Sequence, residues 1–217
     1  MIGGLVMTHS DDHGLVCPPQ LAPVQAAIVP IWKSDEEKSQ VLKVGEDVKG
    51  ELARAGIRVE LDARDSLKPG AKYFEWEAKG VPLRLEIGPR DVAAGQVMAA
   101  RRTGGKAPAP LNGLARSAAL ALDEIQKSLF QTAKDRREAH SIRGVTKQQF
   151  IEFMKQPGGF AYGGFCGAAA CEAEIKQQTA ATVRVLPDPE FRSAETPKNC
   201  MWCGKPSAAE AVWAQAY

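Results

Sequence analysis

The segment QAAIVPI at residues 25–31, followed by SDEEKSQVLKVGEDVKGELARAG at residues 34–56, decides the fold of the first half of the chain. The first segment is an apolar run of strand length, typical of a strand buried on both faces. In the second, Ser34 and Glu37 match the capping box that opens a helix. Apolar residues then recur at helical spacing until Gly56, which is expected to end the helix.

Further elements follow the same alternation. The patterns predict strands at residues 58–61, 83–87 and 96–100, and a helix at residues 73–78. A strand–helix–strand–helix–strand order predicts an α/β domain, which we expect to be built on a mixed sheet. In the strand at 83–87 the aliphatic residues share one face, so Arg84 and Glu86 are expected to point the other way, outward.

The second half predicts a small α+β domain after a long helix at residues 118–140. Thr146 and Gln149 form a second capping box, which opens a short helix. The glycine-rich stretch at 158–164 reads as a strand, and further strands are expected at 182–186 and 212–217.

The first 23 residues look different from both domains. An apolar stretch at residues 2–7 precedes a polar turn and a proline-rich linker, and we expect the apolar stretch to be an unpaired strand edge. The turn HSDDH at residues 9–13 offers metal ligands. Without a helix to align them, metal binding here is the weaker interpretation.

The composition is that of an ordinary globular protein. Hydrophobic residues make up 44% of the 217, and charged residues 25%, with a net charge of +2. That charge excludes a nucleic-acid footprint spread over the whole chain, although residues 84–106 hold five basic residues against two acidic ones. No apolar run suits a membrane span and no signal peptide is evident, so a cytoplasmic location is expected.

Four cysteines near the end of the chain form two close pairs. Cys166 and Cys171 are spaced C-x4-C, and Cys200 and Cys203 are spaced C-x2-C. Such a pattern favours a closed, structural Zn²⁺ site. Two disulfides or four free thiols are the alternatives, and the fifth cysteine, Cys17, reads as a small packed hydrophobe.

The densest run of charge, glycine and aromatic residues lies at 69–91. Within it, Glu77 and Arg84 are expected on outward positions of adjacent elements. Arginine binds the O6/N7 edge of guanine, and a carboxylate accepts hydrogen bonds from the N1–H and N2–H₂ groups of an unpaired guanine. An exposed Glu77–Arg84 ion pair, contributing about 0–1 kcal/mol, is the structural alternative.

This run resembles the P-G-x-K-x-x-x-W-E-x-K-G-V-P-x-R-x-E-x-G-P-x-D segment of the archaeal/eukaryotic-like prolyl-tRNA synthetases, which are class II ligases. The four cysteines and the terminal Tyr217 are similar to the C-terminal zinc module of that family. The resemblance implies a remnant of the catalytic domain at residues 1–23, an anticodon-binding domain at 24–125 and a zinc-binding domain at 126–217. The implied tRNA-binding residues are Lys72, Glu77, Arg84, Arg90, Asp91 and Lys106.

The resemblance also limits the expected activity. The chain looks as if it begins inside the third class II signature motif, so the sites for ATP, Mg²⁺ and proline are expected only in a parent enzyme. No catalytic residue is assigned, and this chain alone is expected to be inactive. In such a parent the partners would be the anticodon stem-loop of tRNA(Pro), the catalytic domain and, through that domain, a second copy of the enzyme.

Three functions compete at this point. The chain is the tRNA-selecting part of a proline–tRNA ligase, a freestanding tRNA-binding module, or a zinc-stabilised interaction domain without an RNA role. The segment at residues 72–91 disfavours the third.

Overall fold

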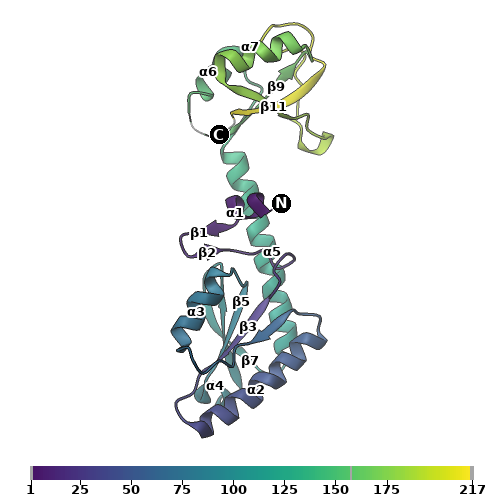
Figure 1. The fold of residues 1–217 in the computed structure, drawn as a ribbon. Coiled ribbons are helices and arrows are strands. Elements are labelled where there is room, and N and C mark those ends of the chain that lie inside the picture. The colour runs from purple at the N-terminus through teal and green to yellow at the C-terminus, as the bar shows by residue number, and fades with distance from the viewer. Residues whose placement is uncertain (1, 157, 216–217) are drawn as a thin grey trace. The chain divides into compact units, whose positions relative to one another are not determined.

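The computed structural model describes residues 2–156 and 158–215. The chain divides into two compact units, Met1–Gln131 and Thr132–Tyr217, which are described separately (Figure 1).

The first unit is built on a five-stranded mixed sheet in the order β4-β3-β5-β6-β7. The strands β3 (Ala26–Pro30), β4 (Val59–Leu61) and β5 (Leu83–Ile87) are parallel. The strand β6 (Gln96–Arg101) pairs antiparallel with β5, and β7 (Lys106–Pro110) pairs antiparallel with β6. The predicted α/β class and mixed sheet are therefore confirmed.

Both faces of this sheet are covered by helices. One face packs against α2 (Asp35–Arg54), α4 (Pro89–Ala93) and the first half of α5 (Leu114–Ala139). The other face packs against α3 (Pro69–Ala78) through a smaller cluster that includes Trp76. Every residue of β3 is buried, as the apolar run predicted.

Several local details differ from the expectation. The Ser34 hydroxyl accepts from the Glu37 amide at 3.3 Å, but the Glu37 carboxylate accepts from the amide of Lys33, one residue further back than a capping box requires. Helix α3 begins about one turn earlier than expected, because Pro69 occupies a position where its missing N–H costs nothing. Neither α4 nor the proline-containing β7 was predicted. Prolines are tolerated in β7 because it lies at the sheet edge.

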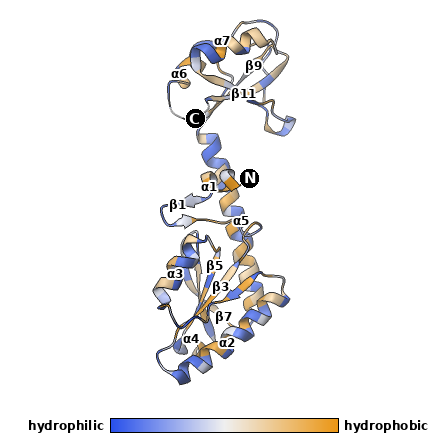
Figure 2. Cartoon of the chain, in the orientation of Figure 1, coloured by the Kyte–Doolittle hydropathy of each residue, from blue (hydrophilic) through white to orange (hydrophobic). Residues whose placement is uncertain are grey.

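The expectation of an unpaired apolar strand at the start of the chain was wrong. Residues Ile2–Thr8 form a helix, α1, and β1 (Ser10–Asp11) and β2 (Gly14–Leu15) form a short hairpin. Helix α1 buries none of its residues, and Figure 2 shows its hydrophobic colouring. Among the described residues, no helix is both long and apolar enough to cross a membrane.

The second unit is the predicted small α+β domain. Its four-stranded sheet has the order β10-β11-β9-β8. The bounds are β8 (Ser141–Arg143), β9 (Phe160–Phe165), β10 (Ala181–Val185) and β11 (Ala209–Gln215), with α6 (Lys147–Phe153), α7 (Ala169–Thr179) and a 3₁₀ turn, η1 (Pro189–Phe191).

The core of this unit is aromatic. The Phe150 ring meets Trp202 and Trp213 edge-on, with centroids 6.2 and 6.1 Å apart. The predicted capping box holds Phe150 in place, because Thr146 and Gln149 satisfy each other's amides. Helix α7 was missed because its N-cap residue, Ala168, offers no side-chain cap. The expectation for Tyr217 concerns a residue outside those that the structure describes.

Candidate nucleic-acid interface and metal centre

A hollow of about 280 Å³ lies in the first unit, at the end of α3 and over β5 and β6. Its wall is polar and mostly cationic. The ionisable residues that line it are Glu77, Arg84, Arg101, Arg102 and Lys106. The structure therefore brings Glu77, Arg84 and Lys106, three of the predicted binding residues, to one site.

Arg84 is held on two sides within this hollow. Its Nε and Nη2 atoms each donate to the Glu86 carboxylate at 3.2 Å, and its guanidinium carbon lies 4.3 Å from the centroid of the Tyr73 ring. Stacking and a two-point hydrogen bond fix the plane of the guanidinium. Arg84 lines the hollow, and among the described residues its Nη1 makes no hydrogen bond to the protein.

Glu86 has a different place from the one expected. It does lie on the opposite face from the aliphatic residues of β5, but that face is covered by α3, so Glu86 is only 3% exposed. Its carboxylate also accepts from Lys106 Nζ at 2.6 Å, which balances the buried charge with two cations. Burial and the nearby Glu86 carboxylate raise the pKa of Tyr73.

Glu77 is the only carboxylate that lines the hollow among the residues the structure describes. No Lys, Arg or His in the described parts of the chain lies within ion-pair distance of its carboxylate, so the alternative Glu77–Arg84 pair is not formed. Glu77 is partly buried on the last turn of α3. A carboxylate in this state is available to accept hydrogen bonds from a ligand.

Arg102 also lines the hollow, and no individual role was expected for it from the sequence. Its Nη1 and Nη2 atoms donate to the two oxygens of Asp11 at 2.8 and 2.5 Å. Its Nε donates to the main-chain carbonyl of Glu77 at 3.1 Å. The guanidinium holds the pKa of Asp11 well below its usual range. Spacing in the sequence gave no signal for a pair 91 residues apart.

Lys72 does not line the hollow. It is 1% exposed, and its Nζ donates to the main-chain carbonyl of Asp62 at 2.9 Å. The Asp62 carboxylate accepts from Trp76 Nε1 at 2.9 Å and from Arg64, so these residues fasten α3 to the end of β4. In this structure Lys72 is therefore a buried structural residue rather than an accessible contact.

Arg90 and Asp91 lie on α4, outside the residues that line the hollow. The Asp91 carboxylate accepts from the Gly88 amide at 3.0 Å and so caps this short helix. Arg90 is exposed to solvent.

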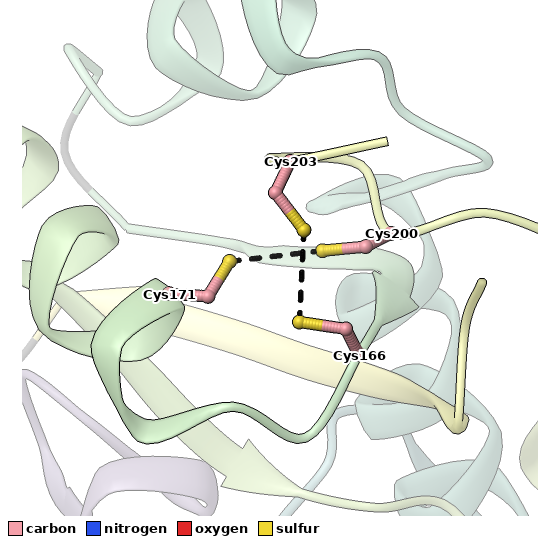
Figure 3. Close-up of side chains that lie close together, drawn as sticks. All are labelled: Cys166, Cys171, Cys200 and Cys203. Carbon is pink, nitrogen blue, oxygen red and sulfur yellow. Dashed lines mark hydrogen bonds between the residues drawn. The ribbon is translucent and has the colours of Figure 1, made fainter. Parts of the chain in front are cut away.

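In the second unit the four predicted cysteines converge. The sulfur atoms of Cys166, Cys171, Cys200 and Cys203 all lie within 4.8 Å of one another, although 28 residues separate the two pairs in the sequence (Figure 3). Cys166 follows β9 and Cys171 lies on α7, whereas Cys200 and Cys203 flank a tight turn. In the described residues this is the one cluster that could hold a metal, and the HSDDH turn does not form another.

The spacing of these sulfurs fits a metal site. Cys171 Sγ lies 3.8 Å from Cys200 Sγ, and Cys203 Sγ lies 3.7 Å from Cys166 Sγ. A disulfide requires about 2.05 Å. A tetrahedral Zn²⁺ with bonds of about 2.3 Å requires sulfur separations of about 3.8 Å. The cluster therefore has the dimensions of a four-thiolate site rather than those of two disulfides.

The backbone around the cluster favours a thiolate at Cys200, whereas burial raises the pKa of Cys171. Burial raises the pKa of Cys200, but the amides of Cys203 and Trp202 that point at its sulfur lower it to about 7. The turn is closed by the Gly204 amide, which donates to the Cys200 carbonyl at 3.0 Å.

Comparison with known families agrees with this architecture. The family described as "Anticodon binding domain" matches residues 25–120, and the one described as "Prolyl-tRNA synthetase, C-terminal" matches residues 147–217. The first covers the hollow and the second covers all four cysteines.

Three relatives that match over the whole chain are each named as a proline–tRNA ligase. Proline–tRNA ligase 2 of Clostridioides difficile is 40% identical over 218 residues, which is 100% of this chain and 44% of the relative. A proline–tRNA ligase of Cenarchaeum symbiosum is 39% identical, with the same coverage of each chain. The chloroplastic/mitochondrial proline–tRNA ligase of Arabidopsis thaliana is 40% identical over 226 residues, 100% of this chain and 40% of its own length.

The chain thus spans less than half the length of these relatives. With the two matched families and identities near 40% over its whole length, it belongs to the prolyl-tRNA synthetase family, of which it comprises the anticodon-binding domain and the C-terminal domain.

Proposed function

We propose that the hollow in the first unit reads the guanines of the proline anticodon. The observation that supports this proposal is that Glu77 and Arg84, a carboxylate and a guanidinium, line the same cavity. The Glu77 carboxylate is unpaired by any described cation, and Arg84 is fixed in orientation by Glu86 and Tyr73.

The chemistry of guanine matches both groups. Its N1–H and N2–H₂ groups are donors that suit a carboxylate, and its O6 and N7 atoms are acceptors that suit a guanidinium. Adenine and the pyrimidines lack this combination. Because Watson–Crick edges are hidden in a duplex, the ligand is an unpaired base, such as one in an anticodon loop.

The other predicted residues contribute in different ways. Lys106 is 47% exposed at its side chain and stands at the rim of the hollow, where it can reach a phosphate or a base. Arg90 and Asp91 lie on α4, and we assign them a contact with a neighbouring part of the same RNA. Lys72 supports α3 from within and does not touch the RNA.

In a full-length relative this region would select tRNA(Pro) for a proline–tRNA ligase. Binding of proline, ATP and Mg²⁺, and dimerisation, belong to the remaining part of such an enzyme. Within this chain we assign residues 1–23 to the catalytic domain and its linker, 24–125 to anticodon binding and 126–217 to the zinc module. The alternative, a freestanding tRNA-binding module, uses the same residues.

We further propose that the four cysteines hold one structural Zn²⁺. The ion would stabilise the fold of the module rather than act on a substrate, because four thiolates leave no coordination position open. The sulfur separations of 3.7 and 3.8 Å support this assignment.

Binding of the 217-residue chain to a proline anticodon stem-loop tests the proposed function. We expect tighter binding than to the same stem-loop with both guanines replaced by adenines. Glu77→Gln keeps the shape of the side chain but removes its charge, so it should weaken the preference and leave residual affinity for the RNA backbone. Equal binding of both RNAs by the folded wild-type chain would contradict the proposal.

A further inference from the structure

We propose that Arg102 is a positioning residue, a brace that holds the backbone of Glu77 and links it to the N-terminal hairpin, β1–β2. Discrimination of guanine would then depend on this hairpin. This inference rests on the proposed role of Glu77. It assigns Arg102 and Asp11 to specificity although neither would touch the base.

The contacts of Arg102 leave little for a ligand. Its side chain is only 5% exposed, and Nε, Nη1 and Nη2 all donate to the protein. Nη2 additionally lies 3.4 Å from the Gly14 carbonyl. Its neighbour Arg101 lines the same hollow but is 40% exposed, and among the described residues its ion pair is with Glu124, which is itself exposed. Of these two arginines, Arg102 is the one that connects the segment of Glu77 with that of Asp11.

The brace acts at the end of α3, where the carbonyls of a helix lack intrahelical partners. The Glu77 carbonyl accepts from the Gly80 amide at 2.9 Å and from Arg102 Nε at 3.1 Å. Both bonds fix the backbone of the residue whose side chain would read the base. The same guanidinium grips Asp11 at two points, so the hairpin and Glu77 are held by one group.

A close backbone approach supports this link independently of Arg102. Gly14 has φ +125°, and a Cβ added to it would lie 2.6 Å from the Ala78 carbonyl oxygen. Gly80 has φ +74°, and its Cβ would lie 2.7 Å from the Leu15 Cβ. Both positions therefore require glycine. The Cys17 amide then donates to the Gly80 carbonyl at 3.1 Å, which continues the seam between the two segments.

The test compares Arg102→Gln and Asp11→Asn with Arg101→Gln as the matched control. Arg101→Gln removes the same charge from the same hollow without touching Glu77 or the hairpin. Each chain is titrated with three anticodon stem-loops, which carry guanine, inosine or 7-deazaguanine at the two guanine positions. Inosine lacks the N2–H₂ donor that Glu77 would accept, and 7-deazaguanine lacks the N7 acceptor that Arg84 would bind.

We expect the wild-type chain to prefer guanine over inosine by about tenfold, a typical effect of one charge-assisted hydrogen bond. In Arg102→Gln and Asp11→Asn this ratio should fall toward one, whereas the ratio of guanine to 7-deazaguanine should persist. Arg101→Gln should keep both ratios and lower overall affinity alone. Asp11 does not line the hollow, so its effect on the inosine ratio cannot come from direct contact.

Hydrogen exchange separates the brace from the proposed function. Amides at residues 14–17 and 77–81 should exchange faster in Arg102→Gln and Asp11→Asn than in Arg101→Gln. Unchanged exchange, or equal inosine ratios in all three variants, would overturn the brace. If the wild-type chain fails to distinguish guanine from inosine, the role of Glu77 is overturned, and with it the specificity role of Arg102. Faster exchange would then show only that Arg102 joins the two segments.

Discussion

The ammonium of Lys72 lies 2.9 Å from the main-chain carbonyl oxygen of Asp62 and 3.6 Å from its carboxylate, and both residues are buried. Asp62 also accepts from Trp76 and Arg64, so it is the acceptor for three neighbours. This arrangement predicts an unequal response to substitution of the two partners.

Asp62→Ala should destabilise the first unit by about 3–5 kcal/mol, because it leaves the Lys72 charge buried without a counterion. Lys72→Met should cost less, since methionine fills the space of the lysine stem and Asp62 keeps two other partners. Denaturant unfolding followed by tryptophan fluorescence measures both. An equal loss in the two variants would show that the pair acts only as a unit.

Acid should destabilise this unit through the same residue. Hydrogen bonding to Arg64 lowers the pKa of Asp62 despite its burial, with further contributions from Trp76 and Lys72. Because the folded pKa is below the ordinary value of about 3.9, the stabilisation is complete above that value and is lost as the pH falls through the folded pKa.

Thermal unfolding between pH 6 and pH 2 checks this dependence. The melting temperature should fall steeply below about pH 4, and Asp62→Asn should show a flatter acid limb from a lower starting point. The same slope in Asp62→Asn and wild type would assign the acid sensitivity to other carboxylates.

Metal analysis tests the cysteine cluster. We expect about one zinc per chain, and removal of the metal by a chelator should unfold the second unit, since structural zinc contributes about 10–16 kcal/mol in small modules. Cys203→Ala should act like the chelator. Cys17→Ala is the control, because Cys17 is buried in the first unit, where its sulfur donates to the Lys79 carbonyl at 3.8 Å, and it is not part of the cysteine cluster. A metal-free chain with a folded second unit would refute the assignment.

Arg84→Lys separates charge from geometry in the hollow. Lysine keeps the positive charge but cannot make the two-point bond to Glu86 or present a planar fork to a base. We expect a loss of about 1–3 kcal/mol on the guanine stem-loop, with discrimination against 7-deazaguanine abolished. A uniform loss on every RNA would make Arg84 a phosphate contact instead.

Gly164→Ala should weaken the second unit although the change is a single methyl group. An added Cβ would collide with the main-chain carbonyl oxygen of Asn199, next to Cys200, and would lie 3.0 Å from Pro197 Cβ. We expect a loss of about 1–3 kcal/mol and weaker retention of zinc. Gly70→Ala is the control. It lies within α3 with nothing within 4 Å, so alanine there should be neutral or stabilising.

Local patterns predicted most of the fold. The buried run of β3, the helical spacing of α2 and the Thr146–Gln149 box each depend on neighbours in sequence, and each was found as expected. The elements that were missed lack such signals. Strand β7 contains two prolines that only an edge position tolerates, and α7 has no cap.

Parts of the candidate site were predictable from residue types and their spacing alone. Cysteine spacing located the cluster, and the 69–91 segment located Glu77 and Arg84. The sequence did not predict which charged side chains are already buried or paired within the protein. The burial of Lys72 and Glu86, and the pairing of Arg102 with Asp11, follow from tertiary contacts between distant segments.

The charges around the hollow have a consequence for ionic strength. Four cations line it, and four carboxylates either line it or pair with them: Glu77, Glu86, Asp11 and Glu124. Counted together with these carboxylates, the cations of the hollow carry no net charge, so a base that enters it adds little to the release of counterions condensed on the RNA. Added salt should therefore lower the affinity for the RNA backbone, whereas the preference for guanine over other bases should stay almost unchanged.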